Sequence, residues 1–247
     1  MKVSCFTEAA LHAHREVAAT LYVSTDVSAV IAAKQEGPTI GEIVRRTRPY
    51  VGEIIVVAGK SSDGTAERAA EGGAVVLADG GRGKGEAIRR AIPQLRSPVT
   101  VFLDADGSHD PEDIPLLVEP IFAERADHVS ASRLRGGSSE LHGGFDEFFR
   151  LTGSSFITAC INWRFKCALS ESQNGFRAIR TAVLRELDLC EDITTIEQEM
   201  IIKTLRRGFR MAEIPSHEHA RAHGASHIHV WRSAPRYGWS LVKYLFF

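Results

Sequence analysis

Short apolar runs alternate with helix-like segments over the first half of the chain. The runs are rich in β-branched residues and predict strands at 27–33, 53–58, 74–78 and 99–103. The segments around them carry helical spacing or helix-start signals and predict helices at 7–22, 39–48, 64–72 and 86–95. Strands and helices in this alternation predict a mostly parallel α/β sheet with helices on both faces.

The alternation loosens beyond Leu134, where longer helices and fewer strands are predicted. A Gly/Ser-rich stretch at 136–139 leads into a helix at 145–168, which is followed by a helix from 194 to 207 and a strand at 209–214. Thr39–Glu42 and Thr194–Glu197 have the spacing of capping boxes, so each predicts a helix start. Because no repeat or clear linker interrupts the pattern, we expect one domain.

The strand at 99–103 ends in the sequence Asp104-Ala-Asp106. Side chains two apart on an extended chain project the same way, so the two carboxylates are predicted to lie side by side at the carboxyl tip of the strand. Ligands of open α/β sheets bind at that edge, and two hard anionic groups suit Mg²⁺ or Mn²⁺, which can hold a diphosphate. The alternative is that these residues only form a turn, since Asp is common at strand ends.

Further candidates for anion binding follow along the chain. Gly83-Lys84-Gly85 lies between a strand and a helix, where glycines let backbone N–H groups approach an anion, although a flexible surface turn would look the same. Arg150 and Ser154 share one face of a predicted helix and could grip a phosphate. Other arginines that could join them, or could be solvated surface charges, are Arg133, Arg177 and Arg221.

Five histidines crowd the region just before the C-terminal segment: His217, His219, His223, His227 and His229. His219 and His223 have the spacing of a helical metal pair, but no matching Cys or acidic cluster lies nearby. We therefore favour loop histidines near an anionic ligand over a zinc site.

The composition, 44% hydrophobic and 25% charged over 247 residues, is that of an ordinary soluble globular protein. The formal net charge of −1 argues against a nucleic-acid partner. The cysteines form no C-x-x-C pair, which is typical of reduced thiols in a cytoplasmic protein: Cys5, Cys160, Cys167 and Cys190. We expect no secretory signal and no membrane span, because the chain shows neither pattern.

The C-terminal segment, residues 231–247, mixes basic, aromatic and aliphatic residues. Such a mixture can rest at a lipid interface, or it can form a helix packed on the domain, and both interpretations stay open. The chain ends within this apolar run at Phe247, which leaves open whether the natural protein continues.

Taken in order, these motifs resemble family 2 glycosyltransferases with the GT-A fold. Residues 30–36, 56–65, 83–85 and 103–111 are similar to the nucleotide-binding half of that family. Residues 132–133, 150–154, 172–177, 197–200 and 221–228 are similar to the acceptor half of its dolichyl-phosphate mannose synthase-like branch. The resemblance implies a single GT-A domain over 1–247, with a nucleotide-sugar and metal half at 27–132, an acceptor half at 133–230 and a membrane-facing helix at 231–247.

The resemblance also implies roles for individual residues. Asp104 would contact the nucleotide or its metal, and Asp106 would ligate Mg²⁺ or Mn²⁺. The rest of the nucleotide pocket would be formed by Ala32, Lys34, Glu36, Gly59 and Lys84. The acceptor phosphate would be held by Arg133, Arg150, Ser154, Arg221 and His227. Catalysis would thus depend on Asp104, Asp106, Arg133 and Arg150.

The implied reaction is an inverting transfer of a sugar from a nucleoside-diphosphate sugar to a polyprenyl phosphate at the cytoplasmic membrane face. An alcohol acceptor would need a general base, for which Glu197 and Glu199 are candidates. A phosphate acceptor, with a second pKa of about 6, needs charge neutralisation instead. Two alternatives remain: the same donor chemistry on a soluble acceptor such as a phosphoglycerate, and a non-catalytic nucleotide-sugar binding module.

This chain departs from the family pattern at the ends of its first two strands. Ala32 and Lys34 stand near the positions of a usual Pro and aromatic residue. Ala58 and Gly59 replace the usual Asp-Asp pair, one carboxylate of which commonly recognises the base. The identity of the donor nucleotide is therefore left open.

Overall fold

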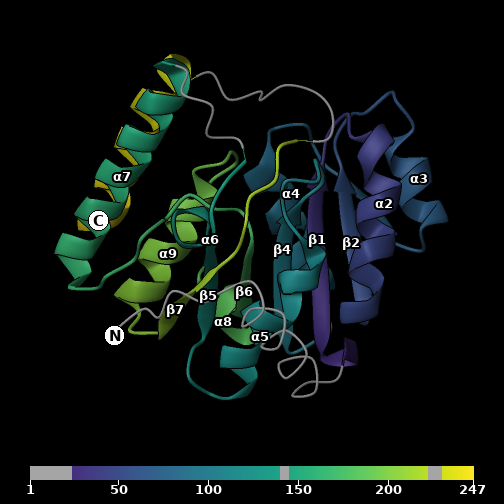
Figure 1. The fold of residues 1–247 in the computed structure, drawn as a ribbon, viewed down its shortest axis with the longest axis horizontal. Helices are drawn as coiled ribbons and strands as arrows, with labels where there is room; N and C mark the ends of the chain where they lie inside the picture. Colours follow the sequence, from purple (N-terminus) through teal and green to yellow (C-terminus); the bar gives the residue numbers. More distant parts are fainter. Residues whose placement is uncertain (1–23, 140–144, 222–229) are drawn as a thin grey trace.

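The computed structural model describes residues 24–139, 145–221 and 230–247, with side chains after the two internal gaps described from Leu151 and Ala234 onward. Its centre is a seven-stranded sheet in the order β3-β2-β1-β4-β6-β5-β7 (Figure 1). The strands are β1 (Val27–Ala33), β2 (Glu53–Ala58), β3 (Val75–Ala78), β4 (Val99–Asp104), β5 (His128–Ser132), β6 (Arg177–Arg180) and β7 (Met211–Pro215). Only β6 runs antiparallel to its neighbours, β4 and β5, so the sheet is mostly parallel, as predicted.

The predicted strands of the first half agree closely with the structure. β1, β2 and β4 are apolar runs buried in the sheet, whereas β3 is a partly exposed strand at its edge. β1 and β2 have the predicted bounds, and β4 extends one residue further, through Asp104. β6 was not predicted, since it is four residues long with an arginine at each end, and only its pairing with β4 and β5 makes it a strand.

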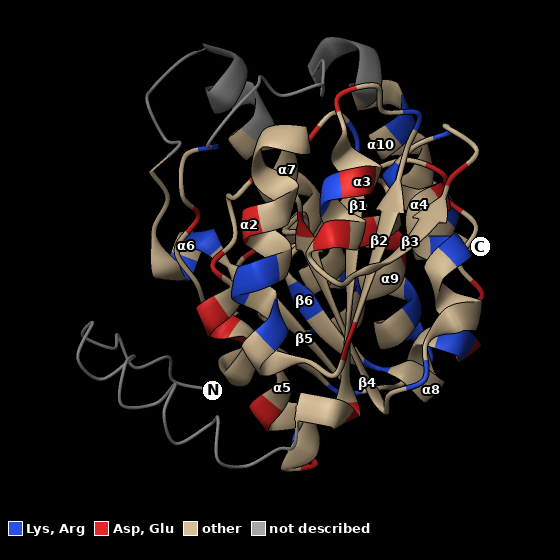
Figure 2. Ribbon diagram, turned by 90° about the vertical axis from the view of Figure 1, so that its right-hand side faces the viewer, with Lys and Arg blue, Asp and Glu red and all other residues tan. Residues whose placement is uncertain are grey.

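Helices cover both faces of the sheet, as predicted. The α-helices are α2 (Gly37–Thr47), α3 (Thr65–Glu71), α4 (Lys84–Ala91), α5 (Ile114–Phe122), α6 (Arg133–Gly136), α7 (Phe145–Phe165), α8 (Thr181–Glu186), α9 (Ile196–Arg206) and α10 (Val230–Phe246). Short 3₁₀ turns lie at Ser24–Asp26, Arg48–Tyr50, Ile92–Gln94 and Pro111–Asp113. The helix predicted at 7–22 lies outside the described residues. Figure 2 shows acidic and basic residues interspersed along these elements, which fits the net charge of −1.

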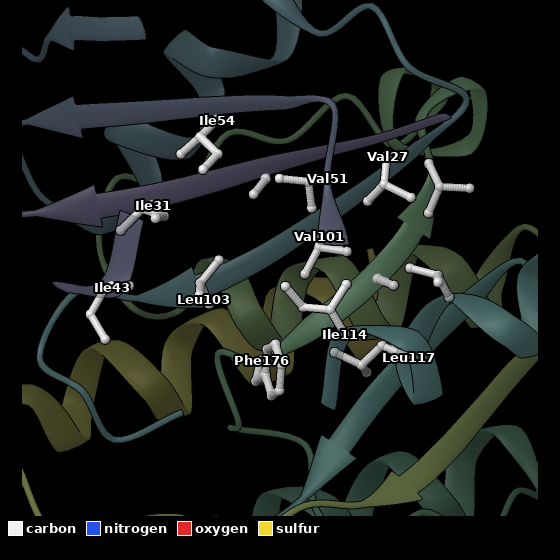
Figure 3. Packing of buried hydrophobic residues seen from close by; sticks show 14 of the residues in the cluster. Val27, Ile31, Ile43, Val51, Ile54, Val101, Leu103, Ile114, Leu117 and Phe176 are labelled. Carbon is white, nitrogen blue, oxygen red and sulfur yellow. The ribbon is translucent and has the colours of Figure 1, made fainter. Parts of the chain in front are cut away.

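The core follows from the alternation of side chains along each strand. On one face, Ile31 and Leu103 belong to a cluster completed by α2, α3 and α5, part of which Figure 3 shows. On the other face, Val30 and Phe102 pack with α4, α8 and α9. A third cluster joins α7, α9 and α10. Helix α9 also packs on the sheet, so α7 and α10 stand beside it as a wall at one side of the molecule (Figure 1).

The two predicted capping boxes are wrong, although a helix forms near each. Helix α2 begins two residues before Thr39, whose hydroxyl donates to the carbonyl of Ala105 (2.7 Å). Helix α9 begins one residue before Glu197, and the Thr194 hydroxyl contacts that of Tyr237 (2.5 Å). In both cases a tertiary partner takes the side chain that would have capped the helix.

Within the described part of the chain, no helix combines the length and apolar character that crossing a bilayer requires.

Candidate active site

A cleft of about 720 Å³ opens along the carboxyl edge of the sheet, beside the junction of β1 and β4. The strand order reverses at this junction, because β2 and β3 lie to one side of β1 and β4 to the other. Ligands of open α/β sheets bind at such a switch point. Residues that the sequence marked as candidates and that line the cleft are Ala32, Lys34, Glu36, Gly59, Lys84, Asp104, Asp106, Arg133, Ser154, Glu197 and Arg221.

One described candidate for a general base, Glu199, does not line the cleft. Glu199 is fully buried outside the cleft, where its carboxylate accepts from the backbone N–H groups of Cys190 and Glu191 and pairs with Lys203. That use leaves it no access to a substrate, so the structure does not support it as a base. The side chain of Arg150, in α7, and the whole of His227 lie outside the described residues.

Lys84 joins two acidic residues at the floor of the cleft. Its Nζ lies 2.5 Å from Oδ1 of Asp104 and donates to Oε1 of Glu197 at 2.7 Å. Burial alone would raise the pKa of the Asp104 carboxyl, but Lys84, His109 and Arg221 together hold it at about 2. Burial alone would lower the pKa of Lys84, yet the two carboxylates raise it above its ordinary value. Lys84 and Asp104 are therefore both charged at neutral pH.

Two sets of glycines make room for this arrangement. A Cβ at Gly175 would lie 2.5 Å from the Nζ of Lys84 and 3.0 Å from Oδ2 of Asp104. Gly83 and Gly85, predicted to approach an anion, instead pack against the backbone of residues 191–193, where a Cβ would lie within 2.7 Å of a carbonyl oxygen. These glycines thus set the start of α4, and with it the position of Lys84.

Asp106 lies in the turn after β4, where Gly107 has a φ of 82°. Its Oδ1 accepts from the backbone N–H (3.0 Å) and the hydroxyl (2.7 Å) of Ser108, and its Oδ2 lies 3.1 Å from Nη1 of Arg221. The two acids therefore share one cleft but have different cationic partners.

Glu36 adds a third carboxyl to this part of the cleft. Its pKa is raised by burial and by the negative charges of Asp106 and Asp104, against the opposing effects of Thr39 and Arg221. A raised carboxyl pKa beside two other acids indicates an excess of negative charge, which a bound cation would relieve.

Arg133 was expected to hold an acceptor phosphate, and the structure places its guanidinium in an ionic network. Its Nη2 lies 2.6 Å from Glu171 and its Nη1 lies 2.7 Å from Glu218. Its Nε is buried and has no acceptor among the described residues. The two carboxylates thus fix the guanidinium of Arg133 in the wall of the cleft.

Arg177 lies behind the cleft and does not line it. Its side chain is 1% exposed and its guanidinium donates to the backbone carbonyls of Glu197 (3.0 Å) and Asn174. The expectation that it joins a cluster of anion-binding arginines is wrong, because the neighbouring carbonyls use its donors. Arg177 instead holds the segment that carries Glu197.

His109 lines the cleft and was not singled out as a ligand group. Its ring stacks on Phe176 with centroids 5.1 Å apart, and its Nδ1 accepts from the backbone N–H of Asp104 (3.1 Å). Burial lowers the pKa of this imidazole, although Asp104 and Asp106 oppose the effect. The ring is therefore neutral at pH 7 with its proton on Nε2.

Of the clustered histidines, His217 and His219 are described and contact each other edge to face, with ring centroids 4.9 Å apart. Their neighbours His223, His227 and His229 lie outside the described residues. Among the residues that are described, no three His, Cys, Asp or Glu side chains form a ready-made metal site.

The architecture matches that of known sugar transferases. Glucosyl-3-phosphoglycerate synthase from Mycobacterium tuberculosis, in complex with Mn²⁺, UDP and glucosyl-3-phosphoglycerate, superimposes with a TM-score of 0.71 at 23% identity, covering 99% of this chain and 86% of that one. The class of the protein is therefore α/β with the GT-A fold, as predicted. Residues 28–194, more than half of the chain, match the model of glycosyl transferase family 2. The chain belongs to that family.

Curated relatives are slightly more similar in sequence and span much of the chain. Glycosyltransferase AglJ from Haloferax volcanii is 27% identical over 192 residues, which cover 77% of this chain and 62% of AglJ. A dolichyl-phosphate hexose transferase of the same organism is 27% identical over 231 residues, covering 91% of this chain and 96% of the relative. This chain thus spans less than two thirds of the first relative and nearly all of the second.

Proposed function

We propose that this chain is an inverting, metal-dependent glycosyltransferase that moves a sugar from a nucleoside-diphosphate sugar to a polyprenyl phosphate. One observation carries the proposal. A single cleft joins the acid pair Asp104 and Asp106 to Arg133, to Arg221 and to a wall formed by α7 and α10. The relative whose length this chain matches best among those above, the dolichyl-phosphate hexose transferase, supports the same acceptor class.

The acid groups of the cleft fit a divalent cation. Mg²⁺ in proteins is usually held by one or two carboxylates together with substrate phosphates, so a cage of three or more protein ligands is not required. Asp104 and Asp106 would hold the ion, and the raised pKa of Glu36 points to negative charge at this place. When bound, Mg²⁺ or Mn²⁺ supplies positive charge for the departing diphosphate.

The transfer itself needs no proton acceptor when the acceptor is a phosphate. A phosphate oxygen forms the new bond to the anomeric carbon from the face opposite the diphosphate, and the electrons of the breaking bond leave with the diphosphate oxygen. Because a phosphate monoester is mostly ionised at neutral pH, with a second pKa of about 6, the site must position and neutralise it. Glu197, held by Lys84 at 2.7 Å, then orients that ammonium and is not the base.

Basic groups across the cleft would hold the acceptor phosphate. Arg133 lines the cleft with its guanidinium, and Ser154 lines it from α7. Arg221 lies 3.1 Å from Asp106 and so stands between the two acids and this pocket. Arg150 and His227 complete the acceptor site by the resemblance to the family.

The outer faces of α7 and α10 support a lipid acceptor. The inner face of α10 packs on the domain through Leu241 and Tyr244, as one of the two expectations had it. Exposed apolar residues lie on the two neighbouring helices outside the cleft: Trp163, Trp239, Val242 and Phe246. Because the 17 residues of α10 include no Asp or Glu and end in a basic last turn, this face suits the interface of an anionic membrane.

Direct transfer assays test the proposal. The purified chain is incubated with labelled nucleotide sugars, Mn²⁺, and either a short polyprenyl phosphate or 3-phosphoglycerate. We expect label on the polyprenyl phosphate only, loss of transfer on chelation of the metal, and full activity in Glu67→Ala, an exposed variant on α3. Transfer to phosphoglycerate alone would overturn the lipid acceptor, and donor binding without transfer to either would favour a binding module.

A further inference from the structure

The three strands β1, β2 and β3 end side by side at one end of the cleft, and each is followed by a different residue. In the parallel register, Ala33 of β1 pairs with Ala58 of β2, and Ala58 pairs with Ala78 of β3. The residues that follow are Lys34, Gly59 and Asp79, and all three line the cleft. The middle strand thus offers bare backbone between a lysine and an aspartate.

The side chains of Lys34 and Asp79 lie close to the space that a side chain at Gly59 would occupy. A Cβ at this position would lie 3.3 Å from Oδ2 of Asp79 and 3.5 Å from Cγ of Lys34. Because Gly59 has no side chain, its backbone is exposed to the cleft, with the carboxylate of Asp79 at one side. A flat ring can approach backbone closely at such a glycine.

One of the two carboxylate oxygens of Asp79 accepts a hydrogen bond from the loop that follows β3. Its Oδ1 accepts from the backbone N–H of Gly81 at 2.9 Å, which fixes the orientation of the group. Its Oδ2 accepts no hydrogen bond from the described part of the chain, and this is the oxygen nearest the space above Gly59. The carboxylate is thus oriented by the turn and has one acceptor oxygen free for a ligand.

The distance along the sheet edge fits a nucleotide. From the tip of β4, which carries Asp104, to the tip of β3 are three strand spacings of about 4.8 Å, or about 14 Å in all. An extended nucleoside diphosphate with its phosphates at Asp104 would bring its base over Gly59, beside Asp79.

We propose that Asp79 reads the base of the donor nucleotide and selects bases that present a ring N–H between carbonyl or amino groups, as uracil and guanine do. This inference rests on the proposed donor function. The carboxylate accepts from that N–H through Oδ2, whereas cytosine and adenine place a lone pair there and are repelled. A site that presents an acceptor to this N–H discriminates against a base without the donor, because the carboxylate then faces a lone pair. The carboxylate that is missing at Gly59 is in effect supplied from the neighbouring strand.

Calorimetric titration of UDP, GDP, CDP and ADP in the presence of Mn²⁺ tests this assignment. We expect UDP or GDP to bind the unmodified chain at least tenfold more tightly than CDP and ADP. Asp79→Ala should weaken the preferred nucleotide about tenfold, as expected for loss of a hydrogen bond to a charged group. Glu67→Ala, which removes an exposed carboxylate from α3, serves as the matched control and should bind normally.

A second variant separates recognition from a purely structural role in the turn. In Gly59→Asp/Asp79→Gly, the new side chain enters the space that the old carboxylate leaves, so we expect much of the affinity lost in Asp79→Gly to return. A structural role in holding the Gly81 turn would give no such recovery. Binding of all four nucleotides within twofold of one another, or an unchanged affinity in Asp79→Ala, overturns the inference and leaves the donor function standing. If none of the four binds the unmodified chain, the donor function itself fails.

Discussion

Replacing Lys84 with methionine should destabilise the chain, because two acids would lose their shared cation. The side chain of Lys84 is 17% exposed, and its partners Asp104 and Glu197 are 29% and 8% exposed. Methionine keeps much of the volume and removes the charge. Two carboxylates would then face each other across the floor of the cleft without compensation.

The magnitude follows from the pKa of Asp104. A carboxyl whose pKa falls from 3.8 to about 2 on folding stabilises the folded state by about 2 kcal/mol at neutral pH. Burial acts against this shift, so the cations contribute more than the net value. Breaking a fully buried pair costs about 3–5 kcal/mol, and this cleft is partly open, so we expect a loss of about 2–4 kcal/mol. For a chain of this size that lowers Tm by about 4–16 °C.

The pH dependence has a definite sign. In the unmodified chain the contribution of Asp104 is complete above about pH 4 and is lost as the pH falls from about 4 to 2, since its folded pKa is the lower one. In Lys84→Met, burial raises the pKa of Asp104. The Asp104 carboxyl is therefore protonated as the pH falls, and this removes the destabilisation caused by its uncompensated charge. The difference in the free energy of unfolding between the unmodified chain and Lys84→Met should therefore be largest at neutral pH and become smaller towards pH 4.

Urea unfolding at pH 7 and pH 4.5 measures this difference. Arg45→Met is the control, because Arg45 pairs with Glu42 at the surface, with side chains 72% and 51% exposed, and should cost at most about 0.5 kcal/mol. Lys84→Met/Glu197→Gln should recover part of the loss, since one uncompensated charge is gone. If Lys84→Met is no less stable than Arg45→Met, or if its deficit grows on acidification, the reasoning about this ion triad is wrong.

Four further predictions concern the cleft and the outer helices. Asp106→Ala should abolish Mn²⁺-dependent donor binding in calorimetry while the circular dichroism spectrum stays unchanged; unaltered affinity would contradict its assignment to the metal. Gly175→Ala places a Cβ 2.5 Å from a buried ammonium and should lower the transfer rate at least tenfold, with wild-type rates refuting the packing argument. Trp163→Ser/Trp239→Ser, at side chains 74% and 70% exposed, should weaken co-sedimentation with phosphatidylglycerol vesicles severalfold and leave transfer to a water-soluble acceptor intact. Arg150→Ala should raise the KM for acceptor more than the Kd for donor; equal losses would undo the division into halves.

Local patterns were sufficient for the first half of the fold and for one part of the site. β1, β2 and β4 are continuous apolar runs, and such runs have few alternatives to a buried strand. Asp104 and Asp106 could be placed because a strand tip is a local feature whose position at the sheet edge follows from the fold class.

Partners distant in sequence could not be predicted in this way. Lys84 and Glu197 are 113 residues apart, and their pairing follows from the packing of the start of α4 against the loop at residues 191–193, which precedes α9. The same holds for Arg177, whose sequence context resembles a surface arginine but whose donors end on buried carbonyls. A charged residue can lie at the surface, form an ion pair or donate to buried carbonyls at similar free energy, and the tertiary structure decides which of these occurs.

The antiparallel strand β6 determines how this protein could exchange parts with its relatives. β5 belongs by position to the half predicted to bind the nucleotide, yet both of its neighbours in the sheet, β6 and β7, come from the half predicted to bind the acceptor. A recombination event at residue 132 would therefore leave β5 among strands that did not evolve with it. A crossover between β4 and β5 would instead keep β5, β6 and β7 in one inherited block, and the pairing of β4 with β6 would be the one junction in the described sheet between strands of different origin.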